Sequence, residues 1–193
     1  RYAELYQRAY LNGILGTQDP ETGMLEYFLP LAAGHSRTYG TPTDSFWCCY
    51  GTGIESFSKL GDSIYFHSDD AVYVNLPVPS VARWAEKGVT LEQRTGFPRE
   101  EGTAITVRVP QPTSFSVNIL VPRWVEQGAS ATLNGERLQV KGAPGTYLQI
   151  DRTWADGDTL QVSMPMSLRT EAMPDDPELV EPILQLRRKQ QNI

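Results

Sequence analysis

The 193-residue sequence has no apolar run that approaches the roughly 20 residues a helix needs to cross a bilayer, and no recognisable signal peptide. It also lacks a surplus of positive charge, because 17 lysines and arginines face 23 aspartates and glutamates, for a net charge of −6. We therefore expect no membrane partner and no nucleic-acid partner, since a run of phosphates would need a cluster of basic side chains. The single basic run, residues 187–189, lies near the C-terminus. The sequence does not distinguish a cytoplasmic from an exported protein, because the first residue is Arg1 and not Met.

Cysteine is scarce as well, and the only two, Cys48 and Cys49, are neighbours. A disulfide between them would close a small strained ring, and neighbouring cysteines cannot cross-link distant parts of a fold. The cysteine count therefore does not indicate the redox compartment. Thr52 followed by Glu55 has the capping-box pattern and predicts a helix over about residues 53–65. Both thiols would then lie near the positive end of a helix dipole, which favours the thiolate. Thiolates serve nucleophilic attack and zinc binding.

Simpler interpretations of the same residues remain open. Free cysteine is often a small buried hydrophobe, and a redox pair is a third possibility, although redox pairs usually have intervening residues. Tetrahedral zinc needs four ligands, or three and a water. His35 and His67 are spare candidates, but neither has ligand-like spacing, so we expect both to be surface or loop histidines. Glu55 is interpreted as a helix cap and not as a catalytic acid.

Five further side chains are candidates for a role in a site or in the core. Glu21 and Glu26 lie on a long loop and can reach a cleft, although no spacing pairs either with a second carboxylate. Trp124 and Trp154 stand at strand or turn edges and are expected to anchor a sandwich core. Trp47 adjoins Cys48, so a pocket role is nearly as well supported as packing.

The chain changes character near residue 68. Tyr2, Leu5, Tyr6 and Ala9 follow helical spacing, and a Gly-, Pro-, Thr- and Asp-rich stretch over residues 17–45 predicts a long loop. The helix near 53–65 closes this first part. Two helices and a loop make a poor domain, so their apolar faces need partners that this sequence does not supply.

From residue 69 onward apolar and polar residues alternate, which is the pattern typical of β-strands. Eight short strands are expected over residues 72–76, 89–93, 104–109, 114–120, 131–133, 137–140, 147–150 and 159–164. Asn134-Gly135 predicts a hairpin turn, and Asp156-Gly157-Asp158 predicts another turn. The fold class is therefore mainly β, an antiparallel β-sandwich over residues 69–170 preceded by a helical segment over 1–68. Residues 171–193 read as an irregular tail, with a turn at 174–177, some helical spacing over 179–186 and disorder over 187–193.

The sequence resembles the bacterial β-L-arabinofuranosidase family over about residues 1–175. The motifs that carry the resemblance occur in the family's order: Arg8-Ala9-Tyr10-Leu11-Asn12-Gly13, Phe46-Trp47-Cys48-Cys49, Gly51-Thr52-Gly53-Ile54-Glu55, Gly61-Asp62-Ser63-Ile64-Tyr65, Pro122-Arg123-Trp124, Leu133-Asn134-Gly135 and Trp154-Ala155-Asp156-Gly157-Asp158. These enzymes are zinc- and cysteine-dependent retaining glycoside hydrolases that act on a carbohydrate substrate. The resemblance implies that residues 1–68 come from the C-terminal end of an (α/α)6 catalytic barrel and that a missing N-terminal barrel segment is the partner of this part.

The resemblance also implies site residues. Cys48 matches the family's zinc-bound nucleophile, Cys49 matches a further zinc ligand, and Tyr27 matches a region that lines the sugar pocket. Gln7 departs from the pattern, because the family commonly has glutamate there. The acid/base glutamate and the remaining zinc ligands lie upstream in the family, so we expect the isolated chain to be inactive and to bind zinc weakly. The alternatives are a noncatalytic β-sandwich accessory or glycan-binding module, and a homo-oligomer that buries the helical faces.

Overall fold

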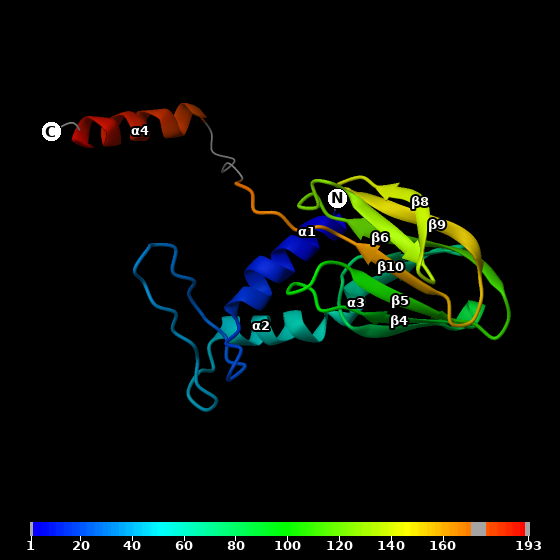
Figure 1. Cartoon of the computed structure of the whole chain (residues 1–193). Coiled ribbons are helices and arrows are strands. Elements are labelled where there is room, and N and C mark those ends of the chain that lie inside the picture. The colour runs from blue at the N-terminus through cyan, green and yellow to red at the C-terminus, as the bar shows by residue number, and fades with distance from the viewer. Residues whose placement is uncertain (1, 171–176, 192–193) are drawn as a thin grey trace.

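A computed structural model describes residues 2–170 and 177–191, in which helices lie at one end of a two-sheet β-sandwich (Figure 1). The first helical stretch is α1 (Tyr2–Ala9), which continues into a π-helical turn, η1 (Tyr10–Ile14), and a 3-10 turn, η2 (Leu15–Thr17). After the loop come α2 (Cys48–Ser58) and α3 (Gly61–Ile64). No helix in the described ranges is long and apolar enough to cross a membrane.

The position of α2 corrects one prediction. The helix begins at Cys48, where Trp47 is the N-cap with extended dihedral angles and no side-chain cap, so Thr52 and Glu55 form no capping box. Thr52 lies inside the helix, and its hydroxyl donates a hydrogen bond to the Cys48 carbonyl oxygen (3.4 Å). The thiols are consequently in the first turn of the helix and not ahead of it, which keeps them at the positive end of the helix dipole.

The backbone runs from α2 into the sandwich with little irregular chain. At the end of α2 the Lys59 amide donates to the Glu55 carbonyl oxygen (3.0 Å), and the Asp62 amide donates to the Lys59 carbonyl oxygen (3.1 Å). The chain then enters β1 directly after Ile64, which is buried. The Ile64 carbonyl oxygen accepts a hydrogen bond from the Asn75 amide (2.9 Å) just beyond β2.

The sandwich consists of a four-stranded and a six-stranded sheet. The first has the order β1-β2-β6-β9 and contains β1 (Tyr65–His67), β2 (Ala71–Val74), β6 (Thr113–Val121) and β9 (Thr146–Trp154). The second has the order β3-β4-β5-β10-β7-β8 and contains β3 (Ser80–Trp84), β4 (Val89–Arg94), β5 (Thr103–Arg108), β10 (Thr159–Ser163), β7 (Ala129–Leu133) and β8 (Glu136–Gly142). A 3-10 turn, η3 (Ala85–Lys87), joins β3 to β4.

The mainly β sandwich and all eight expected strands are confirmed, with two additions. Strands β1 and β3 were not predicted, and β2 pairs with β6 in parallel, so the four-stranded sheet is mixed while the six-stranded sheet is antiparallel. The parallel pair arises because the six-stranded sheet takes β3, β4 and β5 before the chain returns to β6.

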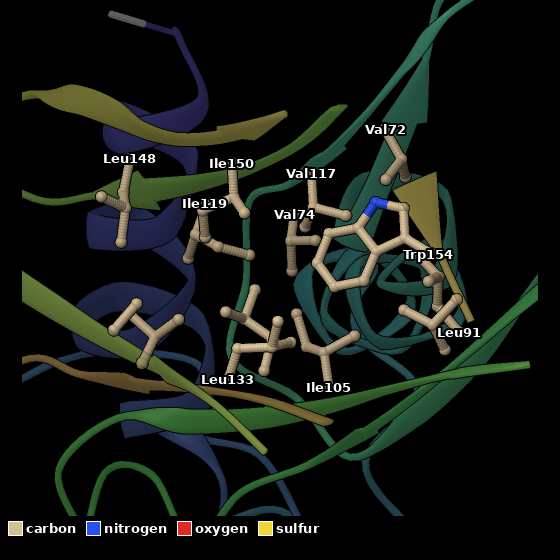
Figure 2. Packing of buried hydrophobic residues seen from close by; sticks show 14 of the residues in the cluster. Val72, Val74, Leu91, Ile105, Val117, Ile119, Leu133, Leu148, Ile150 and Trp154 are labelled. Atoms are coloured by element: carbon tan, nitrogen blue, oxygen red, sulfur yellow. The ribbon is translucent and has the colours of Figure 1, made fainter. Parts of the chain in front are cut away.

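The core lies between the two sheets, and Figure 2 shows side chains from both meeting there. Val117 and Ile150 come from the four-stranded sheet, and Ile105 and Leu133 face them from the six-stranded sheet. Trp154 is fully buried among them, and its Nε1 donates to the Phe115 carbonyl oxygen (2.9 Å). The expectation that Trp154 anchors the core is confirmed.

Both predicted turns are present and are tied to each other. Asn134 (φ 52°) and Gly135 (φ 88°) make the β7–β8 hairpin, where only glycine and asparagine adopt such angles readily. The Asn134 side chain donates to Asp158 Oδ1 (2.8 Å) and accepts from the Thr159 amide (2.9 Å). Asp158 Oδ2 accepts from the Ala155 amide (2.9 Å), so one carboxylate connects the two turns.

Helix α1 contacts the sandwich through polar side chains. Glu4 accepts a hydrogen bond from the Arg123 amide (2.8 Å) and lies 3.5 Å from the Arg123 Nε. Gln7 is 2% exposed, donates to the Asn75 carbonyl oxygen (3.4 Å) and accepts from Trp124 Nε1 (3.3 Å). Gln7 therefore joins helix to sandwich, and Trp124 is partly buried against the core.

The C-terminal part carries α4 (Pro177–Gln191), which lies apart from the sandwich in Figure 1. The helical spacing noted over residues 179–186 is confirmed. The expected disorder over residues 187–191 is wrong, because these residues complete α4 with basic side chains in its last turn, where they complement the helix dipole. The turn expected at 174–177 and the last two residues, 192–193, fall outside the described ranges except for Pro177, which begins α4.

Candidate functional site

The two cysteines occupy the exposed first turn of α2 as free thiols. Their Sγ atoms are 3.8 Å apart, and the Tyr27 hydroxyl lies 3.7 Å from the Cys48 Sγ. The structure thus brings together the three residues that the sequence had singled out: Cys48, Cys49 and Tyr27.

The loop over residues 17–45 delivers Tyr27 to the thiols. Antiparallel bridges between Gln18 and Leu25 and between Glu26 and Tyr39 hold the loop in an ordered path. A Cβ on Gly53 would stand 2.3 Å from Leu25 Cδ1, so the absence of a side chain at Gly53 lets α2 approach the loop closely.

The hydrogen bonding of the three groups favours a thiolate at Cys48. The Tyr27 hydroxyl first, and then the Cys49 thiol, lower the pKa of Cys48 by hydrogen bonding to its sulfur, and these contributions outweigh the effect of desolvation. In return, the bond to Cys48, followed by the bond to Cys49, raises the pKa of Tyr27 to about 12. Tyr27 therefore stays protonated and remains the donor while Cys48 is the group that ionises.

Aromatic rings surround the thiols. Tyr27 meets Trp47 edge-on (5.6 Å between ring centroids), and Trp47 stacks on Tyr50 (5.6 Å). A cavity of about 630 Å³ beside them is lined by Cys48, Trp47, Tyr50 and by apolar and polar residues of the loop and α2. Trp47 is 58% exposed, which agrees better with a pocket role than with core packing. The sequence analysis missed Tyr50, although its position two residues after Cys48 was a signal.

Other candidate residues lie elsewhere or have structural contacts. His67 is on β1 and packs on Trp84 (5.3 Å between ring centroids), and His35 is exposed on the loop. The described residues include no cluster of three or more His, Cys, Asp or Glu side chains that would hold a metal, so neither histidine joins the two thiols.

The carboxylates also stay apart from the thiols. Glu55 is exposed on α2, and Glu21 is exposed on the loop. The Glu26 side chain is buried, and Arg37 Nε lies 3.3 Å from its Oε1, so its charge is compensated by Arg37.

The chemistry and spacing of the two thiols fit zinc. Tetrahedral zinc with Zn–S bonds of about 2.3 Å places any two sulfur ligands about 3.8 Å apart, which is the separation of Cys48 Sγ and Cys49 Sγ. The pair therefore has the separation that two of the four ligands of a tetrahedral zinc site have.

Comparison with known proteins gives a consistent result over most of the chain. The profile of the β-L-arabinofuranosidase GH127 catalytic domain matches residues 1–62, and the profile of the GH127 middle domain matches residues 71–166. The chain belongs to the GH127 β-L-arabinofuranosidase family. Cys48, Cys49 and Tyr27 all lie in the part that matches the GH127 catalytic domain. The sandwich corresponds to the part that matches the GH127 middle domain. No curated protein matches the chain.

Solved structures share this fold. A glycoside hydrolase has a TM-score of 0.73 at 24% identity, over 90% of this chain and 30% of that chain. A GH127 β-L-arabinofuranosidase from Geobacillus stearothermophilus T6 has a TM-score of 0.70 at 25% identity, over 90% of this chain and 29% of that chain. A GH127 β-arabinofuranosidase has a TM-score of 0.70 at 23% identity, over 86% and 28%. The GH127 chain described here thus spans about 30% of the length of these structures.

Proposed function

We propose that this chain supplies the thiolate part of the active site of a retaining glycoside hydrolase that removes L-arabinofuranose residues. In this proposal Cys48 is the nucleophile, Cys49 is a zinc ligand together with Cys48, and Tyr27 contacts the sugar. We further propose that residues 1–68 are the end of the catalytic barrel, residues 69–170 the sandwich domain and residues 171–193 a tail. The observation that carries the proposal is the contact of Cys48 Sγ with both Tyr27 and Cys49 at the start of α2, inside the GH127 catalytic-domain match.

Zinc fits this proposal through the spacing of the two thiols. When bound, zinc would keep both sulfurs deprotonated at neutral pH. The two further ligands that a tetrahedral site needs are assigned to a preceding segment of the enzyme, because the described residues bring no third ligand to the thiols.

In the proposed reaction, Cys48 acts as the nucleophile. Its thiolate attacks the anomeric carbon, so that a C–S bond forms while the glycosidic C–O bond breaks and the leaving oxygen takes a proton from an acid/base group. Water then gives up a proton to that group and displaces sulfur from the anomeric carbon, which returns the thiolate. Tyr27 donates to Cys48 Sγ and so lowers the proton affinity of the sulfur before the attack.

The role of Tyr27 can be measured on this chain alone. In a Cys49→Ser background, the rate of Cys48 alkylation by iodoacetamide is followed against pH. Tyr27→Phe should move the midpoint to higher pH, because the hydroxyl that lowers the pKa of Cys48 is lost. Tyr50→Phe is the matched control, since it removes a hydroxyl from the same aromatic cluster. Equal midpoints for Cys49→Ser and for Cys49→Ser/Tyr27→Phe would contradict the role of Tyr27.

The function itself is tested with two proteins. The isolated chain should hold less than one zinc by elemental mass spectrometry and should not hydrolyse 4-nitrophenyl β-L-arabinofuranoside. A chimera in which residues 1–166 replace the matching segment of a GH127 enzyme should hold zinc and hydrolyse the substrate, and Cys48→Ser should abolish turnover. Turnover that survives Cys48→Ser in the chimera would exclude Cys48 as nucleophile. Turnover by the isolated chain would show that the site is complete without a further segment.

A further inference from the structure

A second pocket, rich in aromatic side chains, lies where α1 and α3 meet the four-stranded sheet. It has a volume of about 420 Å³ and is lined by Tyr2, Ala3, Tyr6, Ser63, Phe66, Tyr73, Asn75 and Tyr147. We call it the tyrosine groove. None of its lining residues belongs to α2 or to the loop over residues 17–45, which line the cavity beside Cys48. The groove is therefore separate from the thiol site.

The walls of the groove come from neighbouring elements and present aromatic faces. Phe66 on β1 and Tyr73 on β2 are directly paired across the two strands, so their side chains lie on the same face of the sheet. Tyr147 at the start of β9 meets Tyr73 edge-on (5.4 Å between ring centroids). Within the described residues Tyr2 and Phe66 are 84% and 53% exposed.

Hydrogen bonds fix the base of the groove. The Tyr147 hydroxyl donates to Asn75 Oδ1 (2.6 Å), and burial, followed by the neighbouring Tyr73, raises the pKa of Tyr147, so its hydroxyl stays neutral. Asn75 is buried, its amide donates to the Ile64 carbonyl oxygen and its own carbonyl oxygen accepts from Gln7. The base is thus formed before any ligand arrives, which lowers the entropic cost of binding.

The chemistry of the lining selects a class of ligand. All eight lining side chains are uncharged, so the described part of the chain offers the groove no counter-charge for an anion or a cation. Aromatic faces pack against the C–H surfaces of a ring, while the Ser63 and tyrosine hydroxyls and the Asn75 amide are groups that exchange hydrogen bonds with ligand hydroxyls. The volume falls within the ~300–1,000 Å³ of small-molecule sites. A neutral sugar ring combines both kinds of surface.

We propose that the tyrosine groove is a noncatalytic binding site for neutral glycans, which holds one or two sugar rings of a polysaccharide. The site is built at the junction of helices and sandwich. It does not depend on Cys48 or on zinc.

The proposal is tested by native affinity electrophoresis of the full 193-residue chain. Gels contain soluble arabinan or arabinoxylan as neutral probes, polygalacturonate as an anionic probe, or no polysaccharide. We expect the neutral polymers to retard the chain and polygalacturonate to have little effect. Tyr2→Ala and Phe66→Ala should each weaken retardation about tenfold, since each removes an exposed ring. Tyr2→Phe should retain it, which separates loss of the ring from loss of the fold.

A matched control distinguishes this site from the thiol site. Trp47→Ala removes an exposed ring beside Cys48 and should leave retardation unchanged. Retardation lost in Trp47→Ala but kept in Tyr2→Ala and Phe66→Ala would assign glycan binding to the thiol site and overturn the groove proposal. Migration unaffected by every neutral polymer would overturn it as well, whereas the proposed function of Cys48 would stand in either case.

Discussion

Gln7 provides a sharp test of how the helical part is held on the sandwich. Its amide donates to the Asn75 carbonyl oxygen and accepts from Trp124 Nε1, and it is 2% exposed. Gln7→Glu keeps an acceptor for Trp124 but replaces the donor with a second oxygen, which faces the Asn75 carbonyl oxygen. A buried carboxylate without its second partner costs about 2–3 kcal/mol, and this cost raises the pKa of the carboxyl above the ordinary value of a glutamate.

The pH dependence of this variant follows from that raised pKa. Below about pH 4.3 the carboxyl is protonated in the folded and unfolded states alike, and its O–H can donate to Asn75 as the amide did. As the pH rises above the ordinary glutamate pKa of about 4.3, the unfolded state loses its proton first and the folded state loses stability, and the loss is constant above the raised pKa of the folded state. Gln7→Glu should therefore match the native chain at pH 4 and differ from it at pH 7.5.

The assay is hydrogen exchange of residues 2–14, corrected for the intrinsic exchange rate at each pH. At pH 7.5 these amides should exchange roughly 30- to 160-fold faster in Gln7→Glu than in the native chain, the factor that corresponds to about 2–3 kcal/mol. Gln18→Glu is the matched control, because the Gln18 amide bond to the Gly23 carbonyl oxygen is open to solvent (3.3 Å). Native-like protection in Gln7→Glu at pH 7.5, or equal loss of protection at both pH values, would refute the reasoning.

Three further predictions concern the sandwich. Trp154→Ala should destabilise the chain by about 3–5 kcal/mol in urea unfolding, because the ring is fully buried, whereas Trp47→Ala should stay near zero. Burial alone would raise the pKa of Asp158, but hydrogen bonds from the Ala155 amide and Asn134, and the charge of Arg152, lower it overall. The carboxylate therefore stabilises the fold above about pH 4, and this stability is lost as the pH falls through the lowered pKa. In thermal unfolding, the difference in Tm between the native chain and Asp158→Asn should be smaller at pH 3 than at pH 7. A difference in Tm that does not change with pH would contradict this. Gly135→Ala should cost about 1–2 kcal/mol because its φ is 88°, while Gly13→Ala, in open helical space, should not destabilise the chain.

The sequence predicted the interior strands well because their burial imposes a strict pattern. Strands β4 and β5 alternate buried and less buried residues along their length, and their large apolar residues, Val89 and Leu91 on β4 and Ile105 and Val107 on β5, are two positions apart. Strands β1 and β3 are short edge strands of three and five residues, whereas the edge strands on the opposite sides, β9 and β8, have nine and seven residues and were predicted. Phe66 and Val81 are exposed there, so these strands carry no alternating apolar signal.

The site was predictable in part. Adjacent cysteines near a helix start are visible in the sequence, but the position of that start was wrong, because Trp47 enters α2 without a capping side chain. The contact of Tyr27 with Cys48 joins residues 21 apart across an irregular loop, for which no periodicity exists. It is created by the close packing of the loop on Gly53, a tertiary event that local propensity does not encode.

The connection from α2 through α3 into β1 has a mechanical consequence for the thiols. Hydrogen-bonded turns join the two helices at Lys59 and Asp62, and the Asn75 amide fastens Ile64 to the neighbouring strand. The C-terminal end of α2 is therefore connected to the sandwich through α3, and the first turn of α2, with Cys48, lies at the opposite end of the helix. A small change in the angle between α2 and the sandwich displaces Cys48 more than it displaces the C-terminal end of the helix. The attachment of α2 to the sandwich therefore helps to determine the position of the Cys48 sulfur.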